Sequence, residues 1–285
     1  MTTTESIGVN NDDSRPRRGR NPEGRMPLAD HLRELRGRLV KSLIAVAIGT
    51  VIGWHYYHQI FDFLAAPIND VVAQAQAQGR DVRLTINDVA GAFTLQIKVA
   101  AMFGFIVACP VWIYQLWRFI TPGLRKNERR WALAFAAVAV PLFLGGVALA
   151  YALFPAALQI MLGFTPDEVA NYLPVDTYLS FFARMVFVFG LAFLTPLILV
   201  ALNIFGVLSG KTLASWWRPI VFGVFVFAAI ATPTGDPINM TLLALPVLAL
   251  VGAALGFCFL NDRRRARNSS EPDYSSWADD EISPL

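Results

Sequence analysis

The sequence predicts an all-α integral membrane protein with six transmembrane helices, and its composition and its segmentation are the observations that predict this. Of the 285 residues, 55% are hydrophobic and 16% are charged, whereas charged residues make up about 25% of an average soluble domain. So few polar side chains cannot cover the surface of a water-soluble domain of this size. Six long apolar stretches, separated by polar segments, account for the composition.

The six predicted spans follow one another along residues 39–260. Their bounds are Leu39–Tyr57, Ala92–Ile120, Trp131–Phe154, Ser180–Phe205, Trp216–Ala231 and Pro237–Leu260. A helix needs about 20 apolar residues to cross about 30 Å of hydrocarbon. The fifth stretch, with roughly 16 residues, reaches only about 24 Å as a helix. We therefore expect the fifth span to thin the bilayer locally or to stop short of one face.

Polar segments flank the membrane domain, which is predicted to cover residues 26–260. Residues 1–25 are mostly Thr, Asn, Asp, Arg and Pro and predict a disordered basic cytoplasmic tail. Residues 261–285 are polar and predict a second disordered cytoplasmic tail. Since the first 38 residues contain no apolar core, no cleavable signal peptide is expected.

The distribution of basic residues predicts that both termini are cytoplasmic. Of the 24 Lys and Arg residues, 19 fall in residues 1–38, in residues 261–285 and in the loops 118–130 and 206–218. The opposite loops hold only Arg80 and Arg83. An excess of Lys and Arg marks the cytoplasmic side of a membrane protein.

The lack of ionisable residues at the centres of the spans argues against several functions. Lys41, Lys98 and Arg184 lie near predicted helix ends, and the preferred interpretation is that they extend to the lipid headgroups. No Asp, Glu or His lies near the centre of a span. Proton-coupled transporters normally need such a group, and no pattern of an intramembrane protease is present. No enzyme activity, cofactor or nucleic-acid partner is predicted.

No metal site or disulfide is expected either. His55 and His58 could share a metal ion at their i, i+3 spacing, but their aromatic neighbours favour an interfacial aromatic belt. Cys109 and Cys258 are the only cysteines, and both lie in apolar stretches. We therefore expect two packed thiols.

The segment before the first span predicts an interfacial helix that continues into that span. Pro27 suits a first helical turn, and an apolar stripe follows it, formed by Leu28, Leu32, Leu35 and Leu39. Glu34 lies on this helix among arginines. From periodicity alone, the simplest interpretation is a weak i, i+4 surface pair with Arg38.

A second cytoplasmic carboxylate follows the second span. Glu128 has four cationic neighbours in the loop that begins with Phe119, and Pro122-Gly123 predicts a turn at the end of the span. Its simplest interpretation is again a solvated ion pair. Two carboxylates on one membrane face also suggest, more weakly, a site for a cationic ligand.

These two segments resemble the signatures of the TatC family, the large subunit of the twin-arginine protein translocase. The similar region runs from Pro27 to about Leu260, and its strongest parts are LADHLRELRGRL at residues 28–39 and YQLWRFITPGLRKNERR at residues 114–130. Shorter matches support them, at Ala66-Pro67, at Asp88-Val89-Ala90 with Phe93 and Lys98, and at Thr232-Pro233 with Asp236.

The resemblance implies a concave, glove-like receptor with six spans in a prokaryotic cytoplasmic membrane. Such a receptor binds Arg-Arg signal peptides of folded cargo, associates with TatA/TatB-like single-span proteins and with further copies of itself, and uses the proton-motive force for export. The residues that the resemblance implies for signal-peptide binding are Glu34, Glu128, Arg36 and Phe119. Those implied for structure or partner contact are Pro67, Phe93, Lys98, Pro122 and Asp236.

Two positions depart from the family pattern. Leu194 stands where many relatives carry a glutamate, and Met240 stands where relatives often carry glutamine. That polar pair is associated with docking of the single-span proteins. Several polar neighbours could make these contacts instead, namely Thr195, Asn203, Asn239 and Thr241. Gly235 is one residue more than the family pattern has before Asp236.

Two different classes of protein also fit parts of the pattern. A small-molecule transporter would need an ionisable or broken-helix site at the membrane midplane, and neither is expected from the sequence. A membrane scaffold that does not recognise arginines would tolerate the loss of Glu34 and Glu128, whereas a receptor would not.

Overall fold

The structure is a computed structural model, and it describes residues 28–79, 81–120, 128–164, 171–231 and 237–268. Its elements in chain order are α1 (Leu28–His55), α2 (Tyr57–Ala77), β1 (Val82–Thr85), α3 (Gly91–Val107), α4 (Cys109–Ile120), α5 (Glu128–Gly163), β2 (Asn171–Pro174), α6 (Val175–Ala192), α7 (Thr195–Ile204), α8 (Gly210–Ser215), α9 (Trp217–Ala231) and α10 (Pro237–Asn268).

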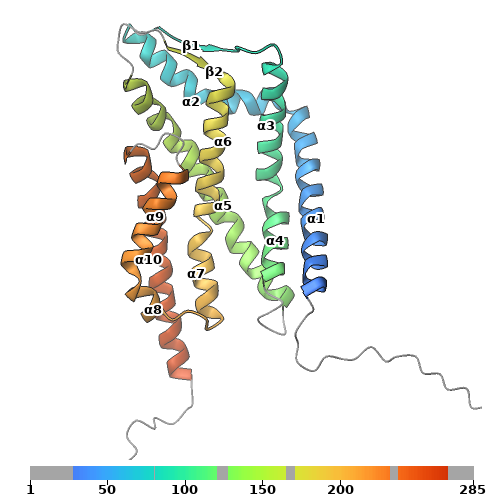
Figure 1. Ribbon diagram of the computed structural model, residues 1–285, viewed down its shortest axis with the longest axis vertical. Coiled ribbons are helices and arrows are strands. Elements are labelled where there is room, and N and C mark those ends of the chain that lie inside the picture. Colours follow the sequence, from blue (N-terminus) through green and yellow to red (C-terminus); the bar gives the residue numbers. More distant parts are fainter. Residues whose placement is uncertain (1–27, 80, 121–127, 165–170, 232–236, 269–285) are drawn as a thin grey trace, which may run out of the picture.

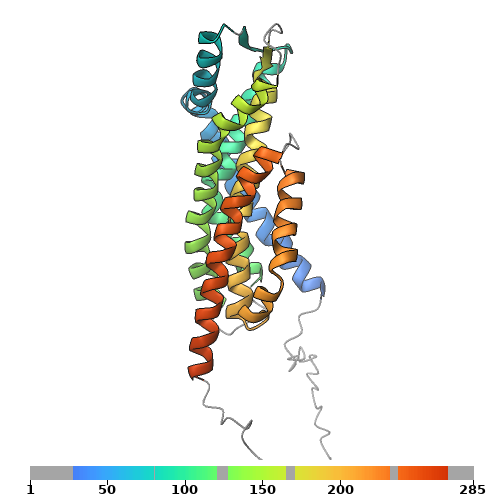
Figure 2. The same cartoon turned by 90° about the vertical axis from the view of Figure 1, so that its left-hand side faces the viewer.

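Most of the helices run side by side along the long axis of the molecule (Figure 1). α1 packs on α3 and α4, α5 packs on α4 and α6, and α10 packs on α7 and α9. α2 and the strands lie at one end, which we call the sheet end (Figures 1 and 2). α1 begins and α10 ends at the opposite end.

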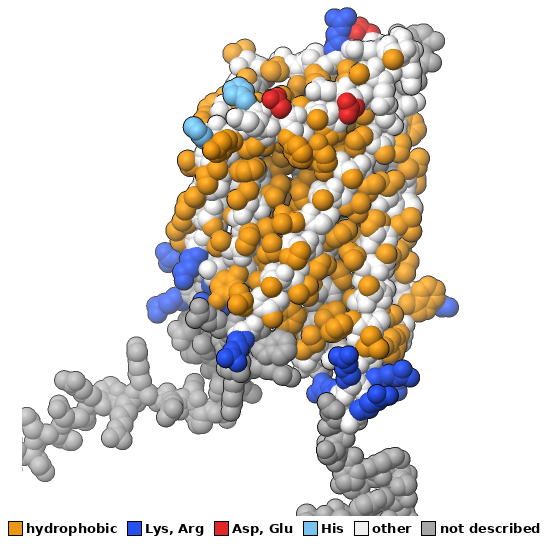
Figure 3. Space-filling view, turned by 180° about the vertical axis from the view of Figure 1, so that it is seen from behind, with side chains coloured by type: hydrophobic (Ala, Val, Ile, Leu, Met, Phe, Trp, Pro, Cys, Tyr) orange, Lys and Arg blue, Asp and Glu red, His pale blue; other side chains and the backbone are white. Residues whose placement is uncertain are grey.

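Charge distinguishes the two ends. Lys and Arg side chains gather at the end where α1 begins, whereas the Asp, Glu and His side chains visible from behind lie near the sheet end (Figure 3). We call the former the basic end. Its exposed cations include Arg33, Arg36, Lys211, Arg263, Arg264, Arg265 and Arg267. The apolar surface between the two ends includes large exposed side chains such as Phe222 and Ile230, 70% and 81% exposed.

Two groups of buried apolar side chains hold the helices together. The larger group centres on Phe154, Phe182 and Phe189 and joins α2, α3, α5, α6, α9 and α10. The smaller group includes Ile113 and Phe143 and joins α4, α5 and α7. α5 contributes to both groups and is therefore the central helix of the fold.

Helix length and apolarity account for several of the predicted spans. Three segments are long and apolar enough to cross a membrane, Ala132–Gly163, Val175–Ile204 and Met240–Arg267. A fourth span is possible if α3 and α4 are taken together. Trp217–Ile230 is a shorter apolar helix, in agreement with the short fifth stretch. The first predicted span lies mostly in α1, which does not belong to this set.

The second and fourth predicted spans are each interrupted, which corrects the expectation from the sequence that no span contains a broken helix. α3 and α4 meet at Ala108 with a bend of 56°, and α6 and α7 are separated by Phe193 and Leu194. Each break lies just before a proline, Pro110 or Pro196. A proline inside a helix lacks the amide donor, and its ring clashes with the carbonyl four residues earlier.

Other elements extend or add to the sequence prediction. The predicted interfacial helix and the start of the first span form one helix, α1, as expected. Helix α2 and the strands were not predicted; β1 pairs with β2 in parallel, with Val82 opposite Asn171. α10 continues beyond Leu260 to Asn268, so residues 261–268 are helical rather than the start of a disordered tail. Residues 1–25 lie outside the described residues.

Small residues allow α1 and α3 to approach closely. A Cβ atom added to Gly104 of α3 would lie 2.4 Å from the backbone nitrogen of Thr50 and 2.8 Å from the carbonyl oxygen of Val46. A Cβ atom on Gly49 of α1 would in turn lie 2.8 Å from the Cα of Gly104. Because these contacts are with backbone, which cannot move aside, no larger residue fits at this crossing.

We expect Gly104→Ala to destabilise the fold by about 1–3 kcal/mol, because overpacking forces the two helices apart. The measurement is the thermal unfolding midpoint of the purified protein in detergent. Gly145→Ala in α5 is the matched control, since nothing lies within 4 Å of its added Cβ. Equal midpoints for the two variants would contradict the close crossing.

Candidate functional site

Glu34 lies near the start of α1, at the basic end, and forms an ion pair with Arg38 one turn later. Arg38 donates from Nε to Oε1 of Glu34 at 3.2 Å and also from Nη2 to the same oxygen. The side chain of Glu34 is 28% exposed and that of Arg38 is 10% exposed. The i, i+4 pair expected from periodicity is therefore present, but it is half-buried rather than on the surface. Arg36 is exposed.

An apolar groove adjoins this pair, between α1 and α4. We call it the α1–α4 groove; its volume is about 320 Å³. It is lined by Leu35, Arg38, Leu39, Ser42, Leu43, Val46, Phe105, Trp112, Gln115, Leu116 and Phe119. Phe119, a predicted binding residue, is therefore in the same groove as Arg38. Nη1 of Arg38 is buried, and no hydrogen-bond partner for it is found in the described part of the chain.

Of Glu128, the other predicted binding carboxylate, the structure describes only the backbone. Glu128 is the first residue of α5, and α5 begins at the basic end, where the first turns of α1 also lie (Figure 1). Its side chain, and all of Pro122 and Asp236, lie outside the described residues. Helix α4 packs against both α1 and α5, so it connects the elements that carry the two glutamates.

Three of the residues predicted for structure or partner contact, Lys98, Pro67 and Phe93, differ in their contacts and exposure. The ammonium of Lys98 donates to Oδ1 of Asp176 at 2.6 Å and to Oγ of Ser180 at 3.1 Å. Lys98 thus links α3 to the start of α6, whereas the preferred interpretation of the sequence was extension toward lipid headgroups. Pro67 is buried within α2. Phe93 is 60% exposed.

Lys98 and Asp176 lie close to a polar cavity at the sheet end. This cavity has a volume of about 300 Å³, and Asp88, Asp176 and Thr85 are among the residues that line it. Because the side chains of Lys98 and Asp176 are 39% and 46% exposed, solvent screens the pair, and we expect it to contribute only about 0.2–1 kcal/mol. The pair orients α3 and α6 more than it stabilises them.

The two histidines considered for metal binding lie against aromatic rings, and the two cysteines are buried thiols. The ring centroids of His55 and Tyr56 are 5.1 Å apart, and those of His58 and Tyr57 are 5.3 Å apart. Within the described ranges, no three His, Cys, Asp or Glu side chains are grouped so that they could hold a metal ion. Cys109 and Cys258 are free, buried thiols, as expected for two packed thiols.

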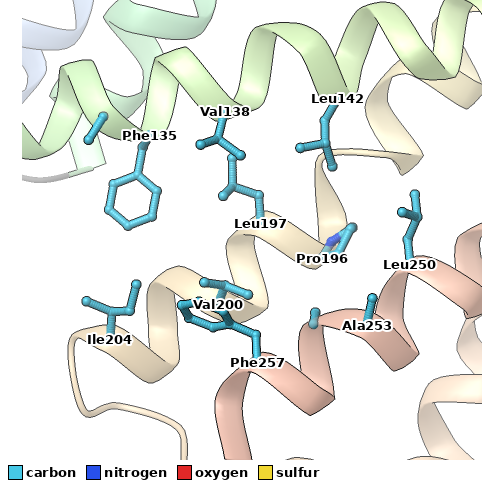
Figure 4. A pocket seen from close by; sticks show the side chains of 12 residues that line it. Phe135, Val138, Leu142, Pro196, Leu197, Val200, Ile204, Leu250, Ala253 and Phe257 are labelled. Carbon is cyan, nitrogen blue, oxygen red and sulfur yellow. The ribbon is translucent and has the colours of Figure 1, made fainter. Parts of the chain in front are cut away.

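Leu194 and Met240, the two positions that depart from the family pattern, both pack against apolar side chains. Leu194 is 6% exposed and lies in the smaller buried group, and Met240 packs against the larger one. Close to Leu194, an apolar cavity of about 400 Å³ lies between α5, α7 and α10 (Figure 4). Pro196, Leu197 and Phe257 point into it (Figure 4).

Asn203, one of the polar residues considered for contact with single-span partners, is 1% exposed and already fully engaged. Its amide nitrogen donates to the carbonyl oxygen of Leu208 and to Oδ1 of Asp262, both at 2.9 Å. Asn261 donates to Oδ1 of Asn203 at 2.9 Å, and the backbone nitrogen of Gly210 donates to Oδ2 of Asp262 at 2.7 Å. These hydrogen bonds join the α7–α8 turn to α10. The periodicity of the sequence did not predict this cluster.

Thr195, Asn239 and Thr241, the remaining polar residues near Leu194 and Met240 in the sequence, differ in their surroundings. The hydroxyl of Thr241 donates to the carbonyl oxygen of Pro237 at 2.7 Å, and Thr195 is exposed. The side chain of Asn239 lies outside the described residues. Thr195 and Thr241 are both exposed, and of the two side chains only that of Thr241 forms a hydrogen bond within the described residues.

Apolar outer helices, a basic end and a half-buried carboxylate define a membrane protein with a candidate cation site. The model of the family described as "Sec-independent protein translocase protein (TatC)" matches residues 30–246. A TatC protein of Frankia casuarinae is 42% identical over 92% of this chain and 74% of its own length. One of Xylanimonas cellulosilytica is 41% identical over 86% of this chain and 88% of its own length.

A solved structure agrees with these relatives. The crystal structure of a "Twin Arginine Translocase Receptor- TatC" superposes with a TM-score of 0.68 at 36% identity, covering 82% of this chain and 100% of that chain. A second crystal structure, of a "Twin Arginine Translocase Receptor- TatC in DDM", gives a TM-score of 0.68 at 35% identity, covering 80% of this chain and 99% of that chain. The chain therefore belongs to the TatC family, and it is a component of the Sec-independent protein translocase.

We expect Asp262→Ala to destabilise the basic end by about 1–3 kcal/mol, because it leaves the backbone amide of Gly210 and one N–H of the Asn203 side chain without an acceptor. The measurement is the rate at which a protease cleaves the α7–α8 turn of the purified protein. Arg263→Ala, which changes an exposed neighbour, is the control. Equal cleavage rates in the two variants would contradict the role of the cluster.

Proposed function

We propose that this chain is the receptor of the translocase, binding the paired arginines of signal peptides on folded cargo and nucleating the complex that exports them with the proton-motive force. The observation that carries the proposal is the carboxylate of Glu34, partly exposed at the basic end and held by Arg38 through one oxygen only. A solved relative is named a twin-arginine translocase receptor, which supports the same function here.

The chemistry of the carboxylate suits arginine better than lysine. A guanidinium is planar, permanently charged and able to donate two parallel hydrogen bonds, whereas an ammonium is a compact point charge. Displacing Arg38 would leave a buried guanidinium unpaired, which is strongly unfavourable. An incoming arginine therefore joins the Glu34–Arg38 pair instead of replacing it.

With this arrangement, the proposed site would need a second carboxylate to bind a pair of arginines. Arg38 already balances the charge of Glu34, so Glu34 alone attracts two further cations only weakly. Glu128, at the start of α5, would supply the second negative charge. The cations of the basic end would repel isolated positive charges that make no directional hydrogen bonds.

The proposed topology has six spans, with both termini in the cytoplasm of a prokaryote and a concave, glove-like membrane domain. The clustering of Lys and Arg at the end where α1 begins and α10 ends supports this orientation (Figure 3). The expected partners are TatA/TatB-like single-span proteins and further copies of this chain.

The decisive experiment is binding of an Arg-Arg signal peptide and its Lys-Lys twin to the purified protein in detergent. We expect the Arg-Arg peptide to bind at least about tenfold more tightly, and Glu34→Ala and Glu128→Ala each to remove this preference. Arg33→Ala, which changes an exposed neighbour on α1, is the control. Equal binding of both peptides to the unaltered protein would refute recognition of arginines.

Export in cells tests whether the two carboxylates matter for transport. We expect Glu34→Ala or Glu128→Ala to abolish export of Arg-Arg cargo while membrane insertion and abundance stay unchanged. The measurement is the fraction of a reporter cargo that reaches the far side of the membrane. If the double variant still exports, the chain is a scaffold rather than a receptor.

The short helix α9 supports a second aspect of the proposal. Its 15 residues span about 22 Å, less than the hydrocarbon thickness of about 30 Å, so it would thin the bilayer at the site of transport. Adding about one turn of leucines to α9 should reduce export at normal abundance. Unchanged export would count against a role for thinning.

A further inference from the structure

The α1–α4 groove begins beside the ion pair of Glu34 and Arg38 and follows α1 away from the basic end. On α1, its lining residues run from Leu35 to Val46, a helical length of about 16 Å. Gln115, Leu116 and Phe119 of α4 are among the residues of its other wall. The candidate cation site therefore continues directly into an apolar groove.

One polar group in this groove lacks a partner. The side chain of Arg38 is nine-tenths buried, and its Nη1 forms no hydrogen bond within the residues that the structure describes. A buried donor without an acceptor is costly, and a guanidinium cannot lose its charge to reduce that cost. An occupant of the groove that supplies a carbonyl oxygen would satisfy Nη1.

Signal peptides carry the matching features in the matching order. A cationic segment comes first, and an apolar segment of about 7–15 residues follows it. As a helix, this apolar segment is about 10–22 Å long, which brackets the length of the groove. An amphipathic or apolar helix commonly binds by inserting side chains at positions i, i+3, i+4 and i+7 into a hydrophobic groove.

We propose that the α1–α4 groove is a second part of the receptor site and binds the apolar segment that follows the paired arginines of a signal peptide. This rests on the proposed function, because Glu34 must hold the arginines at the entrance. Arg38 then has two roles: Nε and Nη2 hold the carboxylate of Glu34, and Nη1 donates to a backbone carbonyl where the apolar segment begins.

Binding in the groove would strengthen the recognition of arginine. An apolar segment seated along Leu39 and Leu43 excludes water from the neighbouring ion pair, and charge–charge interactions are stronger where the effective dielectric constant is low. The apolar segment supplies most of the free energy through buried area, whereas the carboxylates select the residues that come before it. Most of the affinity would thus come from the groove, and the specificity for arginine from the carboxylates beside it.

The test compares two adjacent residues of α1 that are equally exposed. Leu43 is 58% exposed and lines the groove, whereas Ile44 is 54% exposed and does not line it. Two Arg-Arg peptides are titrated against the protein in detergent, one with its natural apolar segment and one with that segment replaced by Ser and Gly. We expect Leu43→Trp, which fills the groove, to weaken binding of the first peptide by about tenfold or more.

The same variant should leave the second peptide unaffected, and Ile44→Trp should leave both unaffected. Glu34→Ala should weaken both peptides. If Leu43→Trp changes neither peptide while Glu34→Ala changes both, the groove holds a lipid chain or another helix, and this inference is wrong while the proposed function stands. If Glu34→Ala also has no effect, the proposed function fails.

Disulfide trapping provides a geometric measurement that does not depend on affinity. A peptide with one cysteine in its apolar segment should form a disulfide with Leu39→Cys, which lies in the groove, and not with Val40→Cys, which is 46% exposed and lies outside it. The natural Cys109 and Cys258 are buried and provide little background. Equal trapping at both positions, or at neither, would overturn the inference.

Discussion

The need to satisfy every backbone hydrogen bond inside hydrocarbon is the constraint on which this structure depends. A helix meets this need within one segment, so a chain with this composition folds almost entirely into helices. The helices break beside Pro110 and Pro196, and Ala108 and Leu194, which lie at the two breaks, are both buried. The small parallel sheet lies at one end of the molecule (Figure 1), away from the apolar surface that would meet lipid.

Much of the helical pattern follows from the sequence because apolarity is a property of whole segments. The stretches behind α5, α9 and α10 were recognised from composition alone. The bend at Ala108 was missed because apolarity stays high across it, although Pro110 was a visible signal. The strands pair residues that are far apart in the chain, Val82 with Asn171, and four-residue strands carry too little periodicity to be predicted.

The site was less predictable, since its features depend on partners from other elements. The spacing of Glu34 and Arg38 predicted their pair, but only the packing of α4 against α1 buries Arg38 and forms the groove. Lys98 was interpreted as a headgroup contact because Asp176, its partner, is far away in the sequence. Asn203 was considered for partner docking, yet three contacts within the chain engage its amide.

Burial of Arg38 distinguishes this carboxylate from an ordinary surface glutamate. An exposed glutamate samples several rotamers, and binding must then meet the entropic cost of fixing it. Glu34 is already fixed by a guanidinium that is itself held by apolar neighbours, so an arginine binding in the proposed site would meet an oriented acceptor. The cost is a partly neutralised charge, which makes recognition depend on directional hydrogen bonds more than on attraction at long range. The proposed receptor would benefit from this balance in rejecting lysine-rich sequences, because a lysine offers charge but not the planar pair of donors.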